Sequence, residues 1–416
     1  HDGRKSFRKI AMNILMISST FPYPPSKGGT QGRTFNLLKY LSKNHDITLI
    51  VQRTADVSDE EVEKLGNFVS ELVVFPRPRD AKTGIIAKLQ RLAQFLQTGT
   101  PPNVLFGYSQ EMQNWIDRAV KSQKFSVITS EHSVNEIYIR PQWQQQIRTV
   151  IDVHSSLYQT CKSQLEIGVS SQELRDRLYL PLLRRYEQKT MHKFSKIVVT
   201  TDDDQKQMEE FAPNGEIYLI PNAVDLDLFP YRSQDPAGHN LVFIGGLDYW
   251  VNIDAACFLA REILPRIQIT YPETTLTLVG ANPSLEVQEL TKLKGVIVTG
   301  RVPSMTTYLH QATVAVIPLR TGFGMKFKTL ESMAAGVPVV ASDRGLEGLT
   351  VEGNNVPLAA LRANSIEEYC TAISSLFESA ELREKLSRNA RKLIEDHYTW
   401  QQAAGKYEQV LTADIC

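Results

Sequence analysis

The stretch GFGMKFKTLESMAAGVPVVAS (residues 322–342) places a glycine- and lysine-containing loop directly before a short helical segment and an apolar strand. Gly336 and Pro338 are typical stop signals for a helix, so we predict about two helical turns over Lys328–Ala335. The β-branched run VPVVAS that follows predicts a buried strand. A helix followed at once by a buried strand is typical of an α/β fold.

The N-terminus of this helix should lie beside Gly322, Gly324, Lys326 and Lys328. A helix N-terminus carries roughly half a positive charge and several unpaired N–H groups, and glycines let a ligand approach the backbone closely. The pattern therefore predicts a local site for an anion such as a phosphate. Glu331, one turn into the helix, can accept hydrogen bonds from a hydroxyl. The alternative is an ordinary polar loop that leads into a solvated helix.

The composition limits the classes of function. A chain of 416 residues is too long for one typical core, so we expect two domains of roughly 200 residues each. Its 46 basic and 46 acidic side chains balance, which argues against a nucleic-acid partner and requires any anion site to be local. No apolar run reaches the ~20 residues of a membrane span.

The cysteines point to a cytoplasmic protein. They show no CxxC or Cys/His spacing, so we expect neither a zinc site nor a disulfide framework. Such thiols fit a reducing compartment. The four cysteines are Cys161, Cys257, Cys370 and Cys416.

Two series of alternating strands and helices follow each other along the chain. The first begins at Met12 with the strand 13–19, a glycine- and proline-rich loop, the helix 34–43 and the strand 46–52. The segment 225–240 has neither helical nor strand periodicity and is predicted to be a linker. We therefore predict two Rossmann-like, doubly wound parallel domains, residues 12–229 and 230–396, which face a cleft. Residues 397–416 are predicted to form a C-terminal helix that packs back toward the N-terminal domain.

The segment 81–97 predicts an amphipathic helix whose apolar face consists of Ile85, Ile86, Leu89, Leu92, Ala93 and Leu96. Lys82, Lys88 and Arg91 lie outside that face. Core packing explains such a pattern, and peripheral contact with the inner face of a membrane is the second interpretation.

Several polar residues are predicted at the ends of first-domain strands, where doubly wound domains carry functional groups. Gly28 and Gly29 follow the first strand and open a helix, which suits either a phosphate or a tight turn. The run VITSEH ends in His132, and the run VIDVH ends in His154. Asp152 precedes His154 by two positions, so the two side chains share one face of the sheet and Asp152 can orient the imidazole.

Taken together, the motifs resemble those of the retaining glycosyltransferases of family 4, which have the GT-B fold and include many bacterial exopolysaccharide and cell-envelope sugar transferases. The resemblance covers the chain from Met12 and rests most specifically on GFGMKFKTLESMAAGVPVVAS. The other motifs are SSTFPYPPSKGGTQGR, IPNAVDLDLF, FIGGLDYWVNIDA and VTGRVPSM.

The resemblance implies roles for individual residues. In the family, a basic residue of the last motif meets the diphosphate of a nucleotide sugar and a glutamate meets the ribose hydroxyls. These roles fall on Lys326 or Lys328 and on Glu331, with Gly322 and Gly324 in the same loop. His154 matches the family histidine at the transferred sugar or reacting centre, and His132 is a second candidate for contact with sugar or acceptor.

The chain departs from the family pattern in two places. Many members have another glutamate eight residues before the first, where this chain has Phe323. Many also have an arginine and a lysine in the loop that reads GGLDYWVN here. Arg301, Lys326 and Lys328 must then supply the positive charge, and we expect the nucleotide base near Arg301 and Val302.

The implied function is transfer of a hexose from a nucleoside diphosphate sugar, most simply a UDP-sugar, to a glycan, glycolipid or small-molecule hydroxyl. Family members are thought to react within an ion pair on one face of the sugar, without a metal or other cofactor. The acidic run TDDDQ (201–205) accordingly predicts a helix N-cap and not a metal site. The alternatives are a non-catalytic nucleotide-sugar-binding subunit, a nucleotide-sugar epimerase and a phosphorylase. A nicotinamide-dependent dehydrogenase is disfavoured because no GxGxxG follows the first strand.

Overall fold

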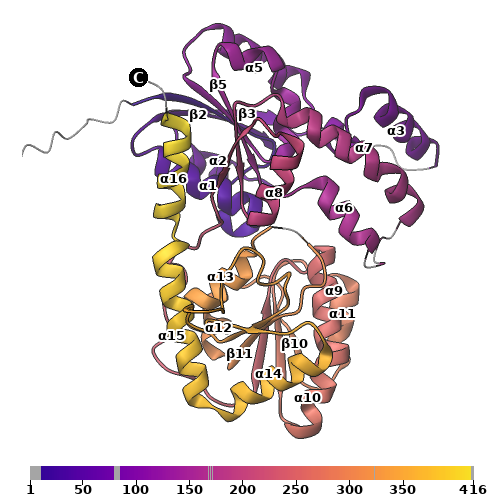
Figure 1. Ribbon diagram of the computed structural model, residues 1–416, viewed down its shortest axis with the longest axis vertical. Helices are drawn as coiled ribbons and strands as arrows, with labels where there is room; N and C mark the ends of the chain where they lie inside the picture. The colour runs from indigo at the N-terminus through magenta and orange to yellow at the C-terminus, as the bar shows by residue number, and fades with distance from the viewer. Residues whose placement is uncertain are drawn as a thin grey trace, which may run out of the picture. The chain divides into compact units, whose positions relative to one another are not determined.

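The computed structural model describes residues 11–78, 85–166, 168, 170, 172–322 and 324–413. The chain divides into two compact units, which we describe one at a time (Figure 1). Unit 1 comprises His1–Ile220 and Ala404–Cys416, and unit 2 comprises Pro221–Ala403. Helix α16 (Trp400–Thr412) therefore begins in unit 2 and ends in unit 1.

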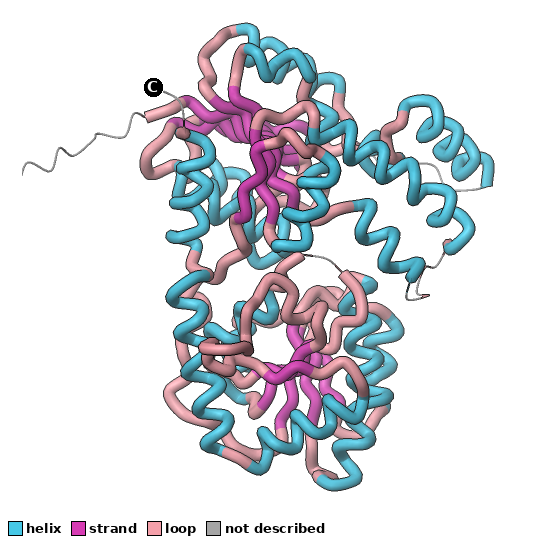
Figure 2. Tube along the Cα trace, viewed as in Figure 1, coloured by secondary structure: helices cyan, strands magenta, loops and turns pink. Residues whose placement is uncertain are grey.

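Unit 1 is built on a parallel sheet of seven strands in the order β3-β2-β1-β4-β5-β6-β7. Helices lie on both sides of this sheet (Figure 2), so its inner strands are buried on both faces: every residue of β4 and all but the first of β1 are buried. The strands are β1 (Asn13–Ser18), β2 (Asp46–Arg53), β3 (Glu71–Pro76), β4 (Val127–Glu131), β5 (Arg148–Val153), β6 (Lys196–Val199) and β7 (Glu216–Leu219).

The helices of unit 1 before α16 are α1 (Gly29–Leu41), α2 (Asp59–Gly66), α3 (Ile85–Thr98), α4 (Pro102–Phe106), α5 (Gln110–Lys121), α6 (Leu157–Glu166), α7 (Glu173–Met191) and α8 (Asp202–Phe211). Helix α8 confirms the N-cap prediction. The Thr201 hydroxyl accepts a hydrogen bond from the Asp204 N–H at 3.1 Å, and three aspartates fill the first turn.

The amphipathic pattern of α3 is only partly correct. Phe95, which was not assigned to the apolar face, is fully buried with Cys161 and Leu183 in a small cluster, whereas Leu96 is 62% exposed. The cause is the local partner: α3 packs beside the helices of this region and not on the sheet (Figure 1), so Phe95 and not Leu96 faces that partner. Arg91 lies over the Phe106 ring, while Lys82 and the Lys88 side chain lie outside the described residues. No helix in the described ranges is long and apolar enough to cross a membrane.

Unit 2 is built on a parallel sheet of six strands in the order β10-β9-β8-β11-β12-β13. The strand order reverses at β8 here and at β1 in unit 1, so each unit has a switch point where two neighbouring connections diverge. The strands are β8 (Asn240–Ile244), β9 (Thr275–Val279), β10 (Val296–Val298), β11 (Val314–Ile317), β12 (Val339–Ala341) and β13 (Leu361–Arg362).

The helices of unit 2 before α16 are α9 (Trp250–Phe258), α10 (Leu264–Thr270), α11 (Leu285–Glu289), α12 (Met305–Gln311), α13 (Phe327–Ala334), α14 (Ile366–Glu378) and α15 (Ala380–His397). A π-helical turn, Leu259–Ile263, joins α9 to α10. Two doubly wound parallel α/β units confirm the predicted fold class.

Helix α13 ends where the sequence predicted. Gly336 has φ +77°, a left-handed conformation that favours glycine. The Val337 N–H donates to the Ser332 carbonyl at 3.0 Å and the Gly336 N–H to the Met333 carbonyl at 3.1 Å, which satisfies the last carbonyls of the helix. A Cβ at Gly336 would lie 2.6 Å from the Tyr231 ring, so the position also lacks space for a side chain.

We predict that Gly336→Ala destabilises unit 2 more than Gly300→Ala does. Both glycines have positive φ, which costs other residues roughly 1–2 kcal/mol, but Gly300 faces open space. Contact with Tyr231 should add about 1 kcal/mol or more at Gly336. Urea unfolding of the two variants and of the double variant Gly336→Ala/Tyr231→Ala measures this. If Tyr231→Ala recovers none of the loss, the steric explanation is wrong.

Candidate functional site

The predicted anion loop follows β11, next to the switch point of unit 2. Gly322 and Gly324 have φ +91° and +79°, so both turns of the loop need glycine. Phe323, where many family members have a glutamate, lies outside the described residues. The loop leads into α13, whose first turn contains no acidic residue.

Lys326 is held inside this loop. Its Nζ lies 3.1 Å from Glu347 Oε2 and donates to the carbonyls of Gly322, at 3.3 Å, and Gly324. The Lys326 and Glu347 side chains are 10% and 5% exposed. A buried ion pair whose lysine also binds two carbonyls fixes the loop, because removing either charge would leave the other buried and unpaired.

Lys328 has a different environment. Its Nζ donates a 2.7 Å hydrogen bond to Asn252 Oδ1 and lies 5.4 Å from the centroid of the Phe243 ring. A Cβ at Gly245 would lie 3.1 Å from Lys328 Cε, so the lysine packs against the glycine loop after β8. In many members of the resembled family, this loop contains the arginine and the lysine that this chain lacks. Burial lowers the pKa of Lys328 to about 8, with a smaller contribution from Lys326.

Glu331 lies three residues beyond Lys328 on α13, on the same side of the helix. Burial raises its pKa to about 7, while Lys328 acts in the opposite direction. No described residue gives the Glu331 carboxylate a hydrogen bond or an ion pair. Burial therefore disfavours the charged form of both side chains, and the two do not form an ion pair with each other. Such an arrangement is typical of groups placed for a ligand.

The predicted base-binding residues follow β10. Arg301 is exposed, and no ion pair of its side chain occurs within the described ranges, whereas Val302 is half-buried and packs on the core of unit 2. Gly300, just before them, has φ +69° and turns the chain there. The Arg301 guanidinium is thus accessible to a ligand, and no ion-pair partner for it lies among the described residues.

In unit 1, Gly28 and Gly29 lie at the N-terminus of α1. Gly29 is the first residue of this helix, both glycines are exposed, and the first turn of α1 has neither a side-chain cap nor an acidic residue. Gly28 has an extended backbone with φ 174°, so its own conformation does not require glycine.

The two predicted histidines lie together at the ends of β4 and β5. Their rings are 5.2 Å apart and edge-on. His132 has φ +79°, an uncommon conformation for a residue with a side chain, and its Nδ1 accepts a hydrogen bond from the Val134 N–H. Burial, and to a lesser degree His154, lowers the pKa of His132 to about 3, so this ring is neutral near pH 7.

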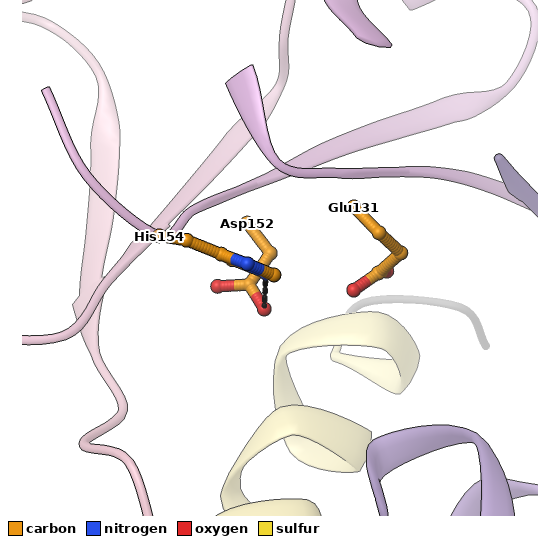
Figure 3. Close-up of side chains that lie close together, drawn as sticks. All are labelled: Glu131, Asp152 and His154. Atoms are coloured by element: carbon orange, nitrogen blue, oxygen red, sulfur yellow. Dashed lines mark ion pairs between the residues drawn. The ribbon is translucent and has the colours of Figure 1, made fainter. Parts of the chain in front are cut away.

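His154 lies against a buried carboxylate, as predicted. Its Nε2 is 3.3 Å from Asp152 Oδ2, although neither ring nitrogen has hydrogen-bond alignment with a protein group (Figure 3). Asp152 also binds Arg33 of α1 through two parallel bonds, Nε to Oδ2 at 2.7 Å and Nη2 to Oδ1 at 2.9 Å. Burial opposes ionisation of Asp152, but the Arg33 guanidinium and His154 hold its pKa below the usual value.

Glu131 completes this cluster from the end of β4. Its Oε1 accepts a 3.0 Å hydrogen bond from the Tyr407 hydroxyl of α16. Burial, reinforced by the neighbouring Asp152 charge, raises the pKa of Glu131 to about 8. One carboxylate of the pair is therefore ionised near pH 7 and the other holds a proton.

Ligand atoms of Glu131, Asp152 and His154 lie within 4.8 Å of one another (Figure 3), a spacing that can suit a metal ion. The chemistry of these groups disfavours one. Arg33 already occupies both oxygens of Asp152, and a protonated carboxyl is a poor metal ligand. A cation here would also lie beside the guanidinium.

The structure adds site residues that the sequence did not assign, among them Arg33, Asn252, Glu347 and Tyr407. A local signal exists for two of them. Arg33 belongs to the glycine-rich motif that opens α1, and Asn252 lies in the first turn of the helix after Gly245 and Gly246. Tyr407 is 276 positions from Glu131, so its contact depends on tertiary folding and leaves no local pattern.

Two family models match the chain. One, described as Glycosyltransferase Family 4, covers residues 27–228, and the other, described as Glycosyl transferases group 1, covers residues 238–379. Among curated proteins, glycogen synthase of Mycobacterium tuberculosis is 28% identical over 217 residues, 49% of this chain and 50% of that protein. The chain thus spans about half the length of this curated relative.

Solved structures share the fold. Sucrose-phosphate synthase from Thermosynechococcus elongatus aligns with a TM-score of 0.69 at 19% identity, covering 96% of this chain and 98% of that chain. HepE from Anabaena, solved in complex with UDP and glucose, aligns with a TM-score of 0.62 at 15% identity, covering 97% of this chain and 100% of that chain. These likenesses confirm the predicted GT-B fold.

The Glu131 pKa predicts a pH dependence of stability. Between about pH 4.5 and 8 the folded chain keeps a proton on Glu131 that the unfolded chain releases, so the free energy of unfolding should fall as pH rises through this window. In Glu131→Gln this contribution disappears, and the curve should be flatter. Urea unfolding across the window measures it, with Tyr407→Phe as a control that keeps the titrating carboxyl. Equal slopes in wild type and Glu131→Gln would contradict the assignment.

Proposed function

We propose that the chain, which matches the model of Glycosyltransferase Family 4 over residues 27–228 and that of Glycosyl transferases group 1 over residues 238–379, transfers a hexose from a nucleoside diphosphate sugar to an acceptor hydroxyl with retention of configuration. The simplest donor is a UDP-hexose. The complex of HepE with UDP and glucose supports this choice for a protein of the same fold. The acceptor is a hydroxyl of a glycan, a glycolipid or a small molecule.

One observation carries the proposal: Lys328 and Glu331 lie on one face of α13, half-buried and unpaired with each other, beside the glycine loop after β8. A lysine in such a place can form charge-assisted hydrogen bonds with a diphosphate and neutralise part of its charge. A carboxylate repels phosphate but accepts hydrogen bonds from hydroxyls. We therefore assign Glu331 to the hydroxyls of the ribose. Lys326 shapes the loop whose backbone approaches the same diphosphate.

The reaction then follows from leaving-group stabilisation. The bond from the anomeric carbon to the diphosphate oxygen breaks, and the acceptor oxygen forms a bond on the same face of the sugar. The acceptor proton passes to the departing phosphate oxygen. Lys328 stabilises the charge that develops on this oxygen, which makes electrostatic support the main contribution of unit 2. No metal ion or other cofactor takes part in this scheme.

Two histidines of unit 1 are candidates for contact with a sugar: His154 and, as a second candidate, His132. The Arg33–Asp152 pair fixes the carboxylate that lies beside His154, and thereby orients the imidazole. We assign His154 to the transferred sugar. His132, held neutral by burial, suits a hydrogen bond with a sugar or acceptor hydroxyl.

The first test is incubation of the purified chain with a panel of nucleotide sugars, with product formation followed by NMR. We expect slow release of UDP from one UDP-hexose, a sugar product of the same anomeric configuration as the donor, and no loss of rate in EDTA. Binding of UDP without turnover of any donor would favour a non-catalytic nucleotide-sugar-binding subunit. Turnover to an epimerised nucleotide sugar, with no transfer, would favour an epimerase.

The ribose assignment predicts that Glu331→Gln raises the Kd of UDP about tenfold, because a hydrogen bond to a charged acceptor becomes one to a neutral amide. Isothermal titration calorimetry with UDP and 2′-deoxy-UDP tests it. The deoxy ligand should bind the wild type more weakly, and the variant should discriminate less between the two. Equal affinity of the wild type for both ligands would show that no residue binds the 2′-hydroxyl, and would contradict the assignment of Glu331 to it.

A further inference from the structure

The two lysines of the anion loop have partners of different charge. Lys326 pairs with the carboxylate of Glu347, so the two charges cancel. Lys328 is held by the side-chain amide of Asn252, which is polar but uncharged. An amide fixes an amine through a dipole and leaves the positive charge of the amine in place.

The Asn252 amide is itself fixed. The residue is 5% exposed, its Nδ2 donates to the Gly246 carbonyl at 2.8 Å, and its backbone N–H donates to the Tyr249 carbonyl at 2.8 Å. These bonds decide the orientation of the amide, because the flipped amide would direct its NH₂ at the lysine ammonium and its oxygen at a carbonyl. Oδ1 is therefore directed at Lys328.

Gly245 leaves room for this contact. A Cβ at that position would lie 2.9 Å from Asn252 Nδ2 and 3.1 Å from Lys328 Cε, and it would push the two side chains apart. The Phe243 ring lies 5.4 Å from the amine and adds a cation–π contact. Three elements, β8, the glycine loop and α9, thus position one amine of α13.

We infer that Asn252 is a positioning residue for the donor diphosphate: it holds the Lys328 amine in a fixed place while leaving the charge of that amine uncompensated. The inference rests on the proposed function and deepens it, since it names the residue that sets the strength of the anion site. A carboxylate at position 252 would still accept a hydrogen bond from the amine but would cancel its charge, and it would lose the Nδ2 bond to the Gly246 carbonyl.

Among the described residues, the charged groups that act on the Lys328 amine are Lys326 and Glu331. Burial lowers the pKa of Lys328 to about 8, with Lys326 also lowering it and Glu331 raising it. The ammonium form binds an anion and the neutral amine does not, so the affinity of the wild type for UDP should fall as pH rises past about 8.

The test compares Asn252→Asp with the wild type by calorimetric titration with UDP. We expect the Kd to rise at least tenfold in Asn252→Asp, and its loss of affinity with pH to move to higher pH. Asn364→Asp is a matched control, because it adds the same charge at an exposed site of unit 2. A residue with a merely structural role would tolerate aspartate without a change in the pH profile.

A double-mutant cycle makes the outcome specific. In a Lys328→Met background, Asn252→Asp should change the Kd of UDP by less than twofold, because the charge that it cancels has been removed. A loss of the same size with and without Lys328 would overturn the inference. If Asn252→Asp does not fold, Asn252→Ala takes its place: it should weaken UDP binding several-fold, and only when Lys328 is present.

A second readout needs no nucleotide and therefore separates this inference from the proposed function. Pulse labelling with acetic anhydride and peptide mass spectrometry gives the pH midpoint at which Lys328 becomes reactive. The midpoint should lie near 8 in the wild type and at least one unit higher in Asn252→Asp. Equal midpoints would overturn the inference even if UDP binds, whereas a shifted midpoint in a chain that binds no nucleoside diphosphate would contradict only the proposed function.

Discussion

Burial of parallel strands on both faces is the constraint on which both units depend. A strand covered by helices on each side has no solvated face, so its polar groups gather where the strand ends. In unit 1 this places Glu131 at the end of β4, His132 directly after it, and His154 directly after β5. In unit 2 it places the glycine loops after β8 and β11. The switch in strand order then separates the neighbouring connections at this edge of each sheet.

The sequence predicted features whose physical cause is local. Apolar runs mark the strands, Gly336 marks the end of α13 because its φ is positive, and Thr201 marks the start of α8 through its hydroxyl. Near the end of α3 the predicted buried residue was wrong, with Phe95 inside and Leu96 outside, because periodicity gives the amphipathic pattern but not the direction of the partner helix. Pairings of buried charges were also beyond a local reading. Lys326 and Glu347 are 21 positions apart, and Arg33 and Asp152 are 119 apart.

The two units solve the same electrostatic problem in opposite ways. In unit 1, Arg33 compensates Asp152 almost completely, and the remaining carboxyl of Glu131 keeps a proton. Little net charge is left, which suits a place for neutral hydroxyls. In unit 2, Lys328 is given a neutral partner and Glu331 no protein partner among the described residues, so charge remains for a ligand. Desolvated but uncompensated charge lowers stability, and binding sites commonly tolerate this loss.

Helix α16 links the order of synthesis to the completion of unit 1. The Tyr407 hydroxyl donates a hydrogen bond to Glu131. Glu408 accepts hydrogen bonds from Asn44 and His45, directly before β2. All of unit 2 leaves the ribosome before these two residues do. A nascent unit 1 therefore lacks the hydroxyl partner of Glu131 until the last residues of unit 2 have been synthesised, and it cannot reach its final packing before then. Translation of unit 2 thus sets the earliest moment at which unit 1, with His132 and His154, can complete its packing.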